Sequence, residues 1–146
     1  MPTVKEFMTK DVITIDANRT VFEAAELMAQ KDVGDLIIMD GKMPIGIVTE
    51  RDLVRRVTAK RKRLNTKVSE IMTTPLRVID PDTSLKEAAR KMVTKGIRRL
   101  PVIKDNKLIG IITATDLAKH LGKKTFTEEI REALGHASLP EPFDKY

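Results

Sequence analysis

The sequence repeats itself once, at an offset of 64 residues, and this internal repeat constrains the fold more than any other feature of the chain. Residues 4–57 align with residues 68–121 without a gap, and roughly a third of the aligned positions are identical. A period of this length is too long for a solenoid repeat and too short for an independently stable domain of ordinary size. We therefore expect two similar units that complete each other's core.

Both repeats contain the same order of predicted elements, β-α-β-β-α. A short β-rich run at 12–15 or 76–79 opens each repeat. A capping-box pattern, Thr20–Glu23 or Ser84–Glu87, then starts a helix whose apolar residues recur at helical spacing. A hairpin and a second helix complete each repeat; we expect the hairpins at 36–49 and 100–113 and the closing helices at 50–57 and 114–121.

Two segments lie outside the repeats. Residues 58–67 form a basic linker that contains the run Lys60–Arg63, which is either a solvated connection or a contact patch. Residues 122–146 form a tail in which we expect a short helix at about 127–134, followed by a proline-containing end.

Composition excludes several classes of protein. The chain has no cysteine, which excludes disulfides, thiolate metal sites and cysteine nucleophiles. It lacks both the apolar core of a signal peptide and a stretch of about 18 apolar residues that could span a bilayer, so we expect a cytoplasmic protein. The net charge of +6 suits anionic partners without choosing among them.

No combination of residues suggests catalysis or a metal site. His120 and His136 are the only histidines, and neither has a visible metal-ligating or nucleophilic neighbour in the sequence. A Gly-rich phosphate loop, a zinc-protease motif and a nucleophile elbow are all absent from the sequence. We therefore expect a protein that is not an enzyme and that needs no cofactor.

The two strand-to-helix junctions carry the most specific motif. Gly46–Asp52 and Gly110–Asp116 match the pattern G-h-x-[ST]-x-x-D, where h is an apolar residue. Together with the Met-Thr pairs at 8–9 and 72–73 and the Ala-Ala helices, they make the chain resemble a tandem CBS-domain pair, or Bateman module, of the stand-alone bacterial and archaeal type. The resemblance covers both repeats and nearly all of the chain outside the linker and the tail.

The resemblance implies a fold, a ligand class and an assembly. The fold is α/β, with two β-α-β-β-α repeats packed through their sheets about a pseudo-twofold axis. Members of this family commonly bind AMP, ADP, ATP, or S-adenosylmethionine and its relatives in two clefts between the repeats, and many of them form homodimers. A regulated protein partner is also expected, because a free-standing sensor needs one.

The motif residues themselves admit two interpretations. A threonine at the N-cap can expose first-turn amides to a phosphate, and an aspartate three residues later can accept hydrogen bonds from ribose hydroxyls. The same Thr-x-x-Asp pattern is also a capping box, which needs no ligand. Glycine before the strand would permit close backbone approach.

The resemblance also distributes residues between two clefts. The first cleft would combine Ile47, Thr49, Arg51 and Asp52 with Leu76, Arg77, Arg98 and Arg99. The second would combine Ile111, Thr113, Thr115 and Asp116 with Val12, Ile13, Gly34 and Asp35. The arginines suit phosphate oxygens, so the first cleft should prefer phosphorylated ligands, whereas the second would be empty or take a less anionic adenosyl compound. Arg98 and Arg99 could instead pair with acidic residues of a dimer partner.

Two other functions remain open from the sequence. The positive charge and the basic run would suit a nucleic-acid-associated protein, although the stacking aromatics of single-strand binders and a helix-turn-helix pattern are missing. A dimerisation scaffold without a ligand is the third alternative.

Overall fold

The computed structural model describes residues 2–122 and residue 128, and it divides the chain into two compact units. We call residues 12–76 the first-repeat unit. We call residues 2–11 together with residues 77–122 the second-repeat unit. The predicted helix at 127–134 and His136 lie outside the described residues.

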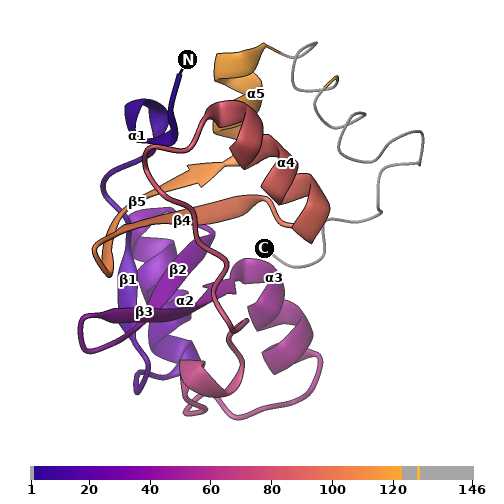
Figure 1. The fold of residues 1–146 in the computed structure, drawn as a ribbon. Helices are drawn as coiled ribbons and strands as arrows, with labels where there is room; N and C mark the ends of the chain where they lie inside the picture. The colour runs from indigo at the N-terminus through magenta and orange to yellow at the C-terminus, as the bar shows by residue number, and fades with distance from the viewer. Residues whose placement is uncertain (1, 123–127, 129–146) are drawn as a thin grey trace. The chain divides into compact units, whose positions relative to one another are not determined.

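The first-repeat unit contains a three-stranded sheet and four helical segments (Figure 1). The sheet has the order β1-β2-β3, in which β1 is parallel to β2 and β2 is antiparallel to β3. In chain order the elements are β1 (Thr14–Asp16), α2 (Val21–Lys31), β2 (Asp35–Asp40), β3 (Met43–Thr49), α3 (Glu50–Asp52), the π-helix η1 (Leu53–Thr58) and the 3₁₀-helix η2 (Val68–Glu70).

The second-repeat unit repeats this plan with a smaller sheet. Its strands pair antiparallel in a two-stranded sheet. In chain order the elements are α1 (Val4–Phe7), α4 (Leu85–Lys95), β4 (Arg99–Lys104), β5 (Lys107–Thr113) and α5 (Ala114–Leu121).

The predicted strand at 76–79 does not form, and Pro101 explains why. In the first-repeat unit the Ile37 amide donates to the Ile13 carbonyl at 3.2 Å, which joins β1 to β2. Pro101 occupies the equivalent position in β4 and has no amide hydrogen. Only Ile79 forms a bridge with β4, so the prediction of a full strand there is wrong.

The predicted helix starts are confirmed. In α2 the Thr20 hydroxyl accepts from the Glu23 amide at 3.1 Å, and the Glu23 carboxylate accepts from the Thr20 amide at 3.2 Å. In α4 the Ser84 hydroxyl accepts from the Glu87 amide at 3.1 Å, but the reciprocal half of the predicted capping box does not form, because the Glu87 carboxylate accepts from Arg90. Both helices bury the apolar stripe that the sequence predicted; the buried residues are Val21, Ala24, Met28, Leu85, Ala88, Ala89, Met92 and Val93.

Each unit also contains the leading segment of the other sequence repeat. Thr73 exchanges two backbone hydrogen bonds with Ile47 of β3, and Thr9 exchanges two with Ile111 of β5. The packing units are therefore offset along the chain from the sequence repeats at 4–57 and 68–121. Each sheet is thus paired with a segment that is distant in sequence from it; we call these two segments, at Thr9 and Thr73, the crossing segments.

Candidate functional site

Both Thr-x-x-Asp motifs form complete capping boxes. Thr49 is the N-cap of α3, and its hydroxyl accepts from the Asp52 amide at 3.2 Å while the Asp52 carboxylate accepts from the Thr49 amide at 2.9 Å. Thr113 and Asp116 form the same pair of bonds at the start of α5, at 3.2 and 3.0 Å. In both motifs one carboxylate oxygen is thus engaged by a backbone amide, and in the first motif the other oxygen, Asp52 Oδ1, lies 3.6 Å from Arg56 Nε.

The β2–β3 register places an acidic strand start beside the first motif. Asp35 lies opposite Thr49 across the hairpin. The Glu50 amide donates to the Gly34 carbonyl at 3.0 Å, which fixes the start of α3 against the start of β2. Thr49 is only 8% exposed, so its hydroxyl is committed to the cap.

The second motif has a basic strand start in the same place. Arg99 lies opposite Thr113 in the β4–β5 register, and the Ala114 amide donates to the Arg98 carbonyl at 2.8 Å. Directly opposed residues have their Cβ atoms about 5 Å apart on one face of the sheet. Within its own unit, therefore, each motif has the neighbours that the sequence analysis had assigned to the other motif.

The remaining predicted ligand-binding residues fall into the same two groups. The first-repeat unit holds Val12, Ile13, Ile47, Arg51 and Leu76, and the second-repeat unit holds Arg77, Ile111 and Thr115. Ile47 and Ile111 are buried and anchor the crossing segments, whereas Arg51, Leu76 and Arg77 are half-buried. The combination of residues across the two repeats stays a prediction.

Two glycines allow the crossing segments to approach the sheets, as the motif predicted. A Cβ atom on Gly46 would lie 2.5 Å from the Met72 sulfur and 2.9 Å from the Thr73 carbonyl oxygen. A Cβ atom on Gly110 would lie equally close to Met8 and Thr9, at 2.5 and 2.9 Å. Both sites therefore exclude any larger residue unless the backbone moves.

Arg56 is a neighbour of the first motif that the sequence analysis missed. Its guanidinium donates to the Ile71 carbonyl at 2.9 Å and to the Met72 carbonyl at 3.3 Å, and its Nε lies 3.6 Å from Asp52 Oδ1. Arg56 thus connects the motif aspartate to the segment that crosses β3. Its spacing of four residues from Asp52 on a helix was the signal that could have identified it.

The equivalent position in the second-repeat unit is His120, which makes a different contact. Its ring lies against that of Phe7, with centroids 4.1 Å apart and an angle of 36° between the planes. His120 is exposed. A ring contact in one unit therefore replaces a hydrogen-bonded arginine in the other.

The part of the chain that the structure describes contains neither a candidate metal site nor a candidate membrane-spanning helix. Within residues 2–122 and 128, no group of three or more His, Asp or Glu side chains could hold a metal ion. No helix in this part of the chain is both long and apolar enough to cross a bilayer.

Known proteins are similar to this chain over both repeats. Residues 4–59 and 68–123 each match the CBS domain family. The chain is 41% identical over 118 residues to the CBS domain-containing protein YhcV of Bacillus subtilis, covering 81% of this chain and 84% of that protein. It is 42% identical over 117 residues to the uncharacterized protein MK0525 of Methanopyrus kandleri, covering 78% of this chain and 60% of that protein.

A solved structure supports the same assignment. The CBS domain pair of protein MJ0100, in complex with 5′-methylthioadenosine and S-adenosyl-L-methionine, superposes with a TM-score of 0.76 at 28% identity. The superposition covers 85% of this chain and 98% of that chain. A protein whose two repeats are both CBS domains is a regulatory module. This domain content indicates that the protein is not an enzyme. The chain therefore belongs to the CBS-domain family, with one CBS motif in each of its two repeats.

Proposed function

We propose that the protein senses an adenine nucleotide or a related adenosyl compound at its Thr-x-x-Asp motifs. The observation that carries the proposal is the paired geometry of the motifs: each aspartate is held by its threonine amide through one oxygen. A carboxylate fixed in this way can accept hydrogen bonds from vicinal ribose hydroxyls through its other oxygen. The adenosyl ligands of the MJ0100 pair support this ligand class.

The charges beside the two motifs favour different ligands. Arg98 precedes β4 and Arg99 begins it next to Thr113, whereas Gly34 precedes β2 and Asp35 begins it next to Thr49. Guanidinium groups suit phosphate oxygens, and an aspartate repels them. Within the units, the Asp116 motif is therefore the better site for a phosphorylated ligand, which reverses the preference expected from the sequence.

Calorimetry with AMP on the Asp52→Ala and Asp116→Ala variants tests both levels of the proposal. Losing the ribose contact should weaken binding by roughly tenfold to a hundredfold, corresponding to about 1.5 to 3 kcal/mol. We expect the larger loss for Asp116→Ala. A larger loss for Asp52→Ala would favour the pairing across the repeats that the sequence predicted.

Thermal unfolding of the same variants provides the control. Each substitution removes half of a capping box and should cost about 1 kcal/mol of folding stability whether or not a ligand binds. Destabilisation of both variants with unchanged AMP affinity would show that the motifs act only as helix caps.

Self-association forms a second part of the proposed function. The first-repeat unit exposes four large apolar side chains, Phe22 at 47%, Met43 at 50%, Val54 at 61% and Leu64 at 60%. The Phe22 amide donates to the Leu64 carbonyl at 3.2 Å, so Phe22 and Leu64 are neighbours. We propose a homodimer, and sedimentation at micromolar concentration giving the monomer mass of 16.4 kDa would contradict it.

The basic run Lys60–Arg63 favours nucleic acid as the competing partner. All four residues are exposed, and none of them joins an ion pair within the part of the chain that the structure describes. Titration of labelled DNA and labelled AMP at two salt concentrations distinguishes the functions. We expect AMP binding to persist at the higher salt concentration, whereas DNA binding through phosphates would fall steeply.

A further inference from the structure

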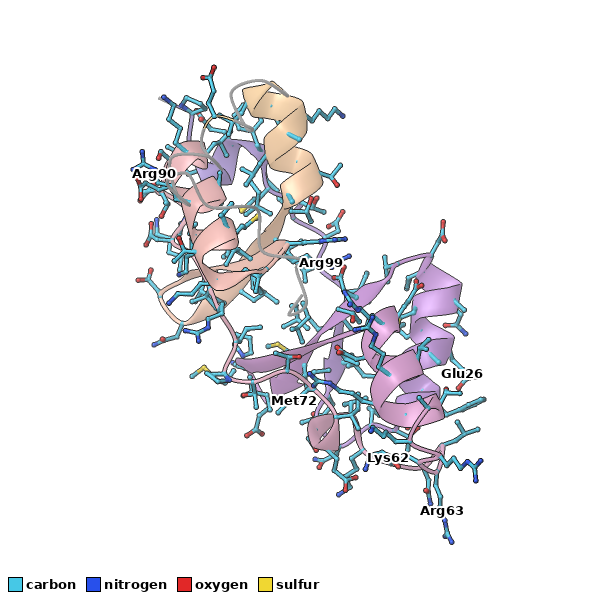
Figure 2. All side chains as sticks on the ribbon, turned by 90° about the vertical axis from the view of Figure 1, so that its right-hand side faces the viewer. Glu26, Lys62, Arg63, Met72, Arg90 and Arg99 are labelled. Carbon is cyan, nitrogen blue, oxygen red and sulfur yellow. The ribbon has the colours of Figure 1, made fainter. Side chains whose placement is uncertain are left out.

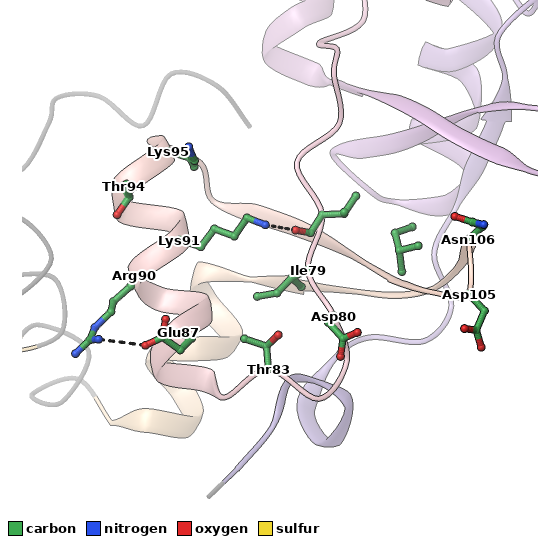
Figure 3. A pocket seen from close by; sticks show the side chains of 12 residues that line it. Ile79, Asp80, Thr83, Glu87, Arg90, Lys91, Thr94, Lys95, Asp105 and Asn106 are labelled. Carbon is green, nitrogen blue, oxygen red and sulfur yellow. Dashed lines mark hydrogen bonds and ion pairs between the residues drawn. The ribbon is translucent and has the colours of Figure 1, made fainter.

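The second-repeat unit contains a cavity that is separate from its Thr-x-x-Asp motif. The cavity has a volume of about 730 Å³ and lies between α4, residues 78–83 and the turn that joins β4 to β5 (Figure 3). The turn residues Asp105 and Asn106 line it, whereas Thr113 lies at the opposite end of the hairpin. At about 3.3 Å per residue, the length of β4 places the two sites roughly 20 Å apart.

The first-repeat unit has an equivalent but smaller cavity with a different charge. It measures about 420 Å³ and is bordered by α2 and by residues 14–19. Its helix contributes Glu26 and Leu27, and the equivalent residues of α4 are Arg90 and Lys91. The smaller cavity is thus acidic, whereas in the larger one the cations of α4 lie among the carboxylates of Asp80, Glu87 and Asp105, and Arg90 pairs with Glu87. Arg90 and Glu26 are both labelled in Figure 2.

Lys91 is the central one of these α4 cations. It is half-buried, and its Nζ donates to the Val78 carbonyl. Burial, followed by the charges of Lys95 and Arg77, lowers the pKa of Lys91 below its ordinary value. Neither Lys91 nor Lys95 joins an ion pair within residues 2–122 and 128. The unit therefore holds cations close together, an arrangement that an anion would stabilise.

Three side chains are placed to share one anion. Lys91, Thr94 and Lys95 stand at positions i, i+3 and i+4 of α4, so they lie on the same face of the helix, and all three line the cavity. Two ammonium groups and a hydroxyl can donate to phosphate oxygens. Ile79 and Ile103 add an apolar surface that suits an organic group attached to the phosphate.

We propose that this cavity, which we call the α4 cavity, binds a small phosphorylated molecule through Lys91, Thr94 and Lys95. The site is independent of the adenosyl ligand proposed above, because it shares no residue with either Thr-x-x-Asp motif. The first-repeat unit lacks an equivalent site, since Leu27 replaces the central lysine.

The test is an amide NMR titration with inorganic phosphate and with phenyl phosphate. The variants are the double substitution Lys91→Met and Lys95→Met, and a control pair, Lys60→Met and Lys119→Met, that removes the same charge from exposed positions elsewhere. We expect phosphate to shift the Thr94 and Lys95 resonances, and phenyl phosphate to bind more tightly because of the apolar surface. The α4 variant should bind at least fivefold more weakly, and the control variant within twofold of the wild type.

Other outcomes would overturn the proposal. One is a phosphate affinity of the α4 variant equal to that of the wild type. The others are no change in the Thr94 and Lys95 resonances at phosphate concentrations well above millimolar, or resonance shifts confined to Thr113–Asp116. Without phosphate the α4 variant should unfold at nearly the same temperature as the wild type, because relief of the repulsion between the two lysines offsets the lost hydrogen bond from Lys91 to the Val78 carbonyl. This measurement separates loss of binding from misfolding, and Asp116→Ala should leave phosphate binding in the α4 cavity unchanged.

Discussion

The first-repeat unit joins three strands into one sheet, whereas the second-repeat unit joins two, although both units derive from one repeated sequence. The difference lies at a single pair of equivalent positions, Ile37 and Pro101. The Ile37 amide ties β1 to β2, and proline offers no amide hydrogen for the same bond. The Lys91 side chain donates to the next carbonyl along this segment, that of Val78. One missing backbone donor thus changes how an edge of the unit is built.

The two units agree where backbones meet and differ where side chains face outward. The glycines under the crossing segments and the Thr-x-x-Asp caps have the same geometry in both. The strand starts beside the caps are acidic in one unit and basic in the other, and so are the helices beside the cavities. Close packing limits substitution severely, and solvent-facing positions have no such limit. Two copies of one fold can therefore take different ligands.

Substituting the crossing glycines should have the largest effect. Gly46→Ala and Gly110→Ala should each lower the free energy of unfolding by roughly 2–3 kcal/mol, because the new Cβ meets backbone and sulfur atoms. Urea unfolding measures both. Gly41→Ala is the control: it has open space but a φ of +61°, so we expect a loss of only about 1 kcal/mol. Unequal losses at Gly46 and Gly110 would show that the crossings are not equivalent.

Arg56 should matter more than its counterpart His120. Arg56→Gln removes two hydrogen bonds to carbonyls and the contact with Asp52, and the partly exposed site should lose about 1 kcal/mol. Arg55→Gln, on an exposed neighbouring position, should change stability little. His120→Gln removes a ring contact worth roughly 0.5 kcal/mol. Equal stability of the Arg56 and Arg55 variants in urea would mean that the arginine clamp contributes nothing.

Replacing Pro101 should allow a third strand to join the sheet of the second-repeat unit, with almost no change in the free energy of unfolding. In Pro101→Ile the new amide can donate to the Arg77 carbonyl, as Ile37 donates to Ile13. The hydrogen bond gains about 1 kcal/mol, and the lost rigidity of proline in the unfolded chain offsets most of it. Hydrogen exchange should therefore reveal a protected amide at position 101 with little change in unfolding midpoint. Rapid exchange there would show that Pro101 is not what keeps the third strand from forming.

The smallest effect concerns the cap of α2 and its dependence on pH. The Thr20 amide and the Arg19 guanidinium donate to Glu23, and these bonds lower the pKa of its carboxyl below the ordinary 4.5. The resulting stabilisation is complete above pH 4.5 and is lost as the pH falls through the lowered pKa. Glu23→Gln should flatten this acid limb of the stability profile.

The local elements were predictable because their signals lie within a few residues of one another. The capping patterns located the starts of α2 and α4, and the turns Asp40–Lys42 and Asp105–Lys107 located the hairpins. The strand at 76–79 was predicted wrongly because β-rich composition does not show whether the neighbouring strand has the backbone amides needed to donate hydrogen bonds to it. Pro101 was visible in the sequence, but its position opposite that segment was not.

The motifs of the candidate site could be predicted from the sequence, but the residues that lie beside each motif could not. The Thr-x-x-Asp caps were identified from spacing alone, and their hydrogen bonds are as predicted. Arg56 was missed because its contacts at Ile71 and Met72 come from a segment fifteen or more residues away. The neighbours of each motif within its unit followed from strand register, which pairs Asp35 with Thr49 and Arg99 with Thr113.

By itself, the sequence determined that the chain has two copies of one α/β unit, where their helices begin, and which residues cap them. Periodicity, turn residues and caps act between near neighbours, so they can be read along the chain. Only the tertiary structure decided that Thr73 pairs with β3 and Thr9 with β5, and that the lysines of α4 border a cavity. Those contacts depend on the path of the backbone between distant segments, which local patterns do not specify.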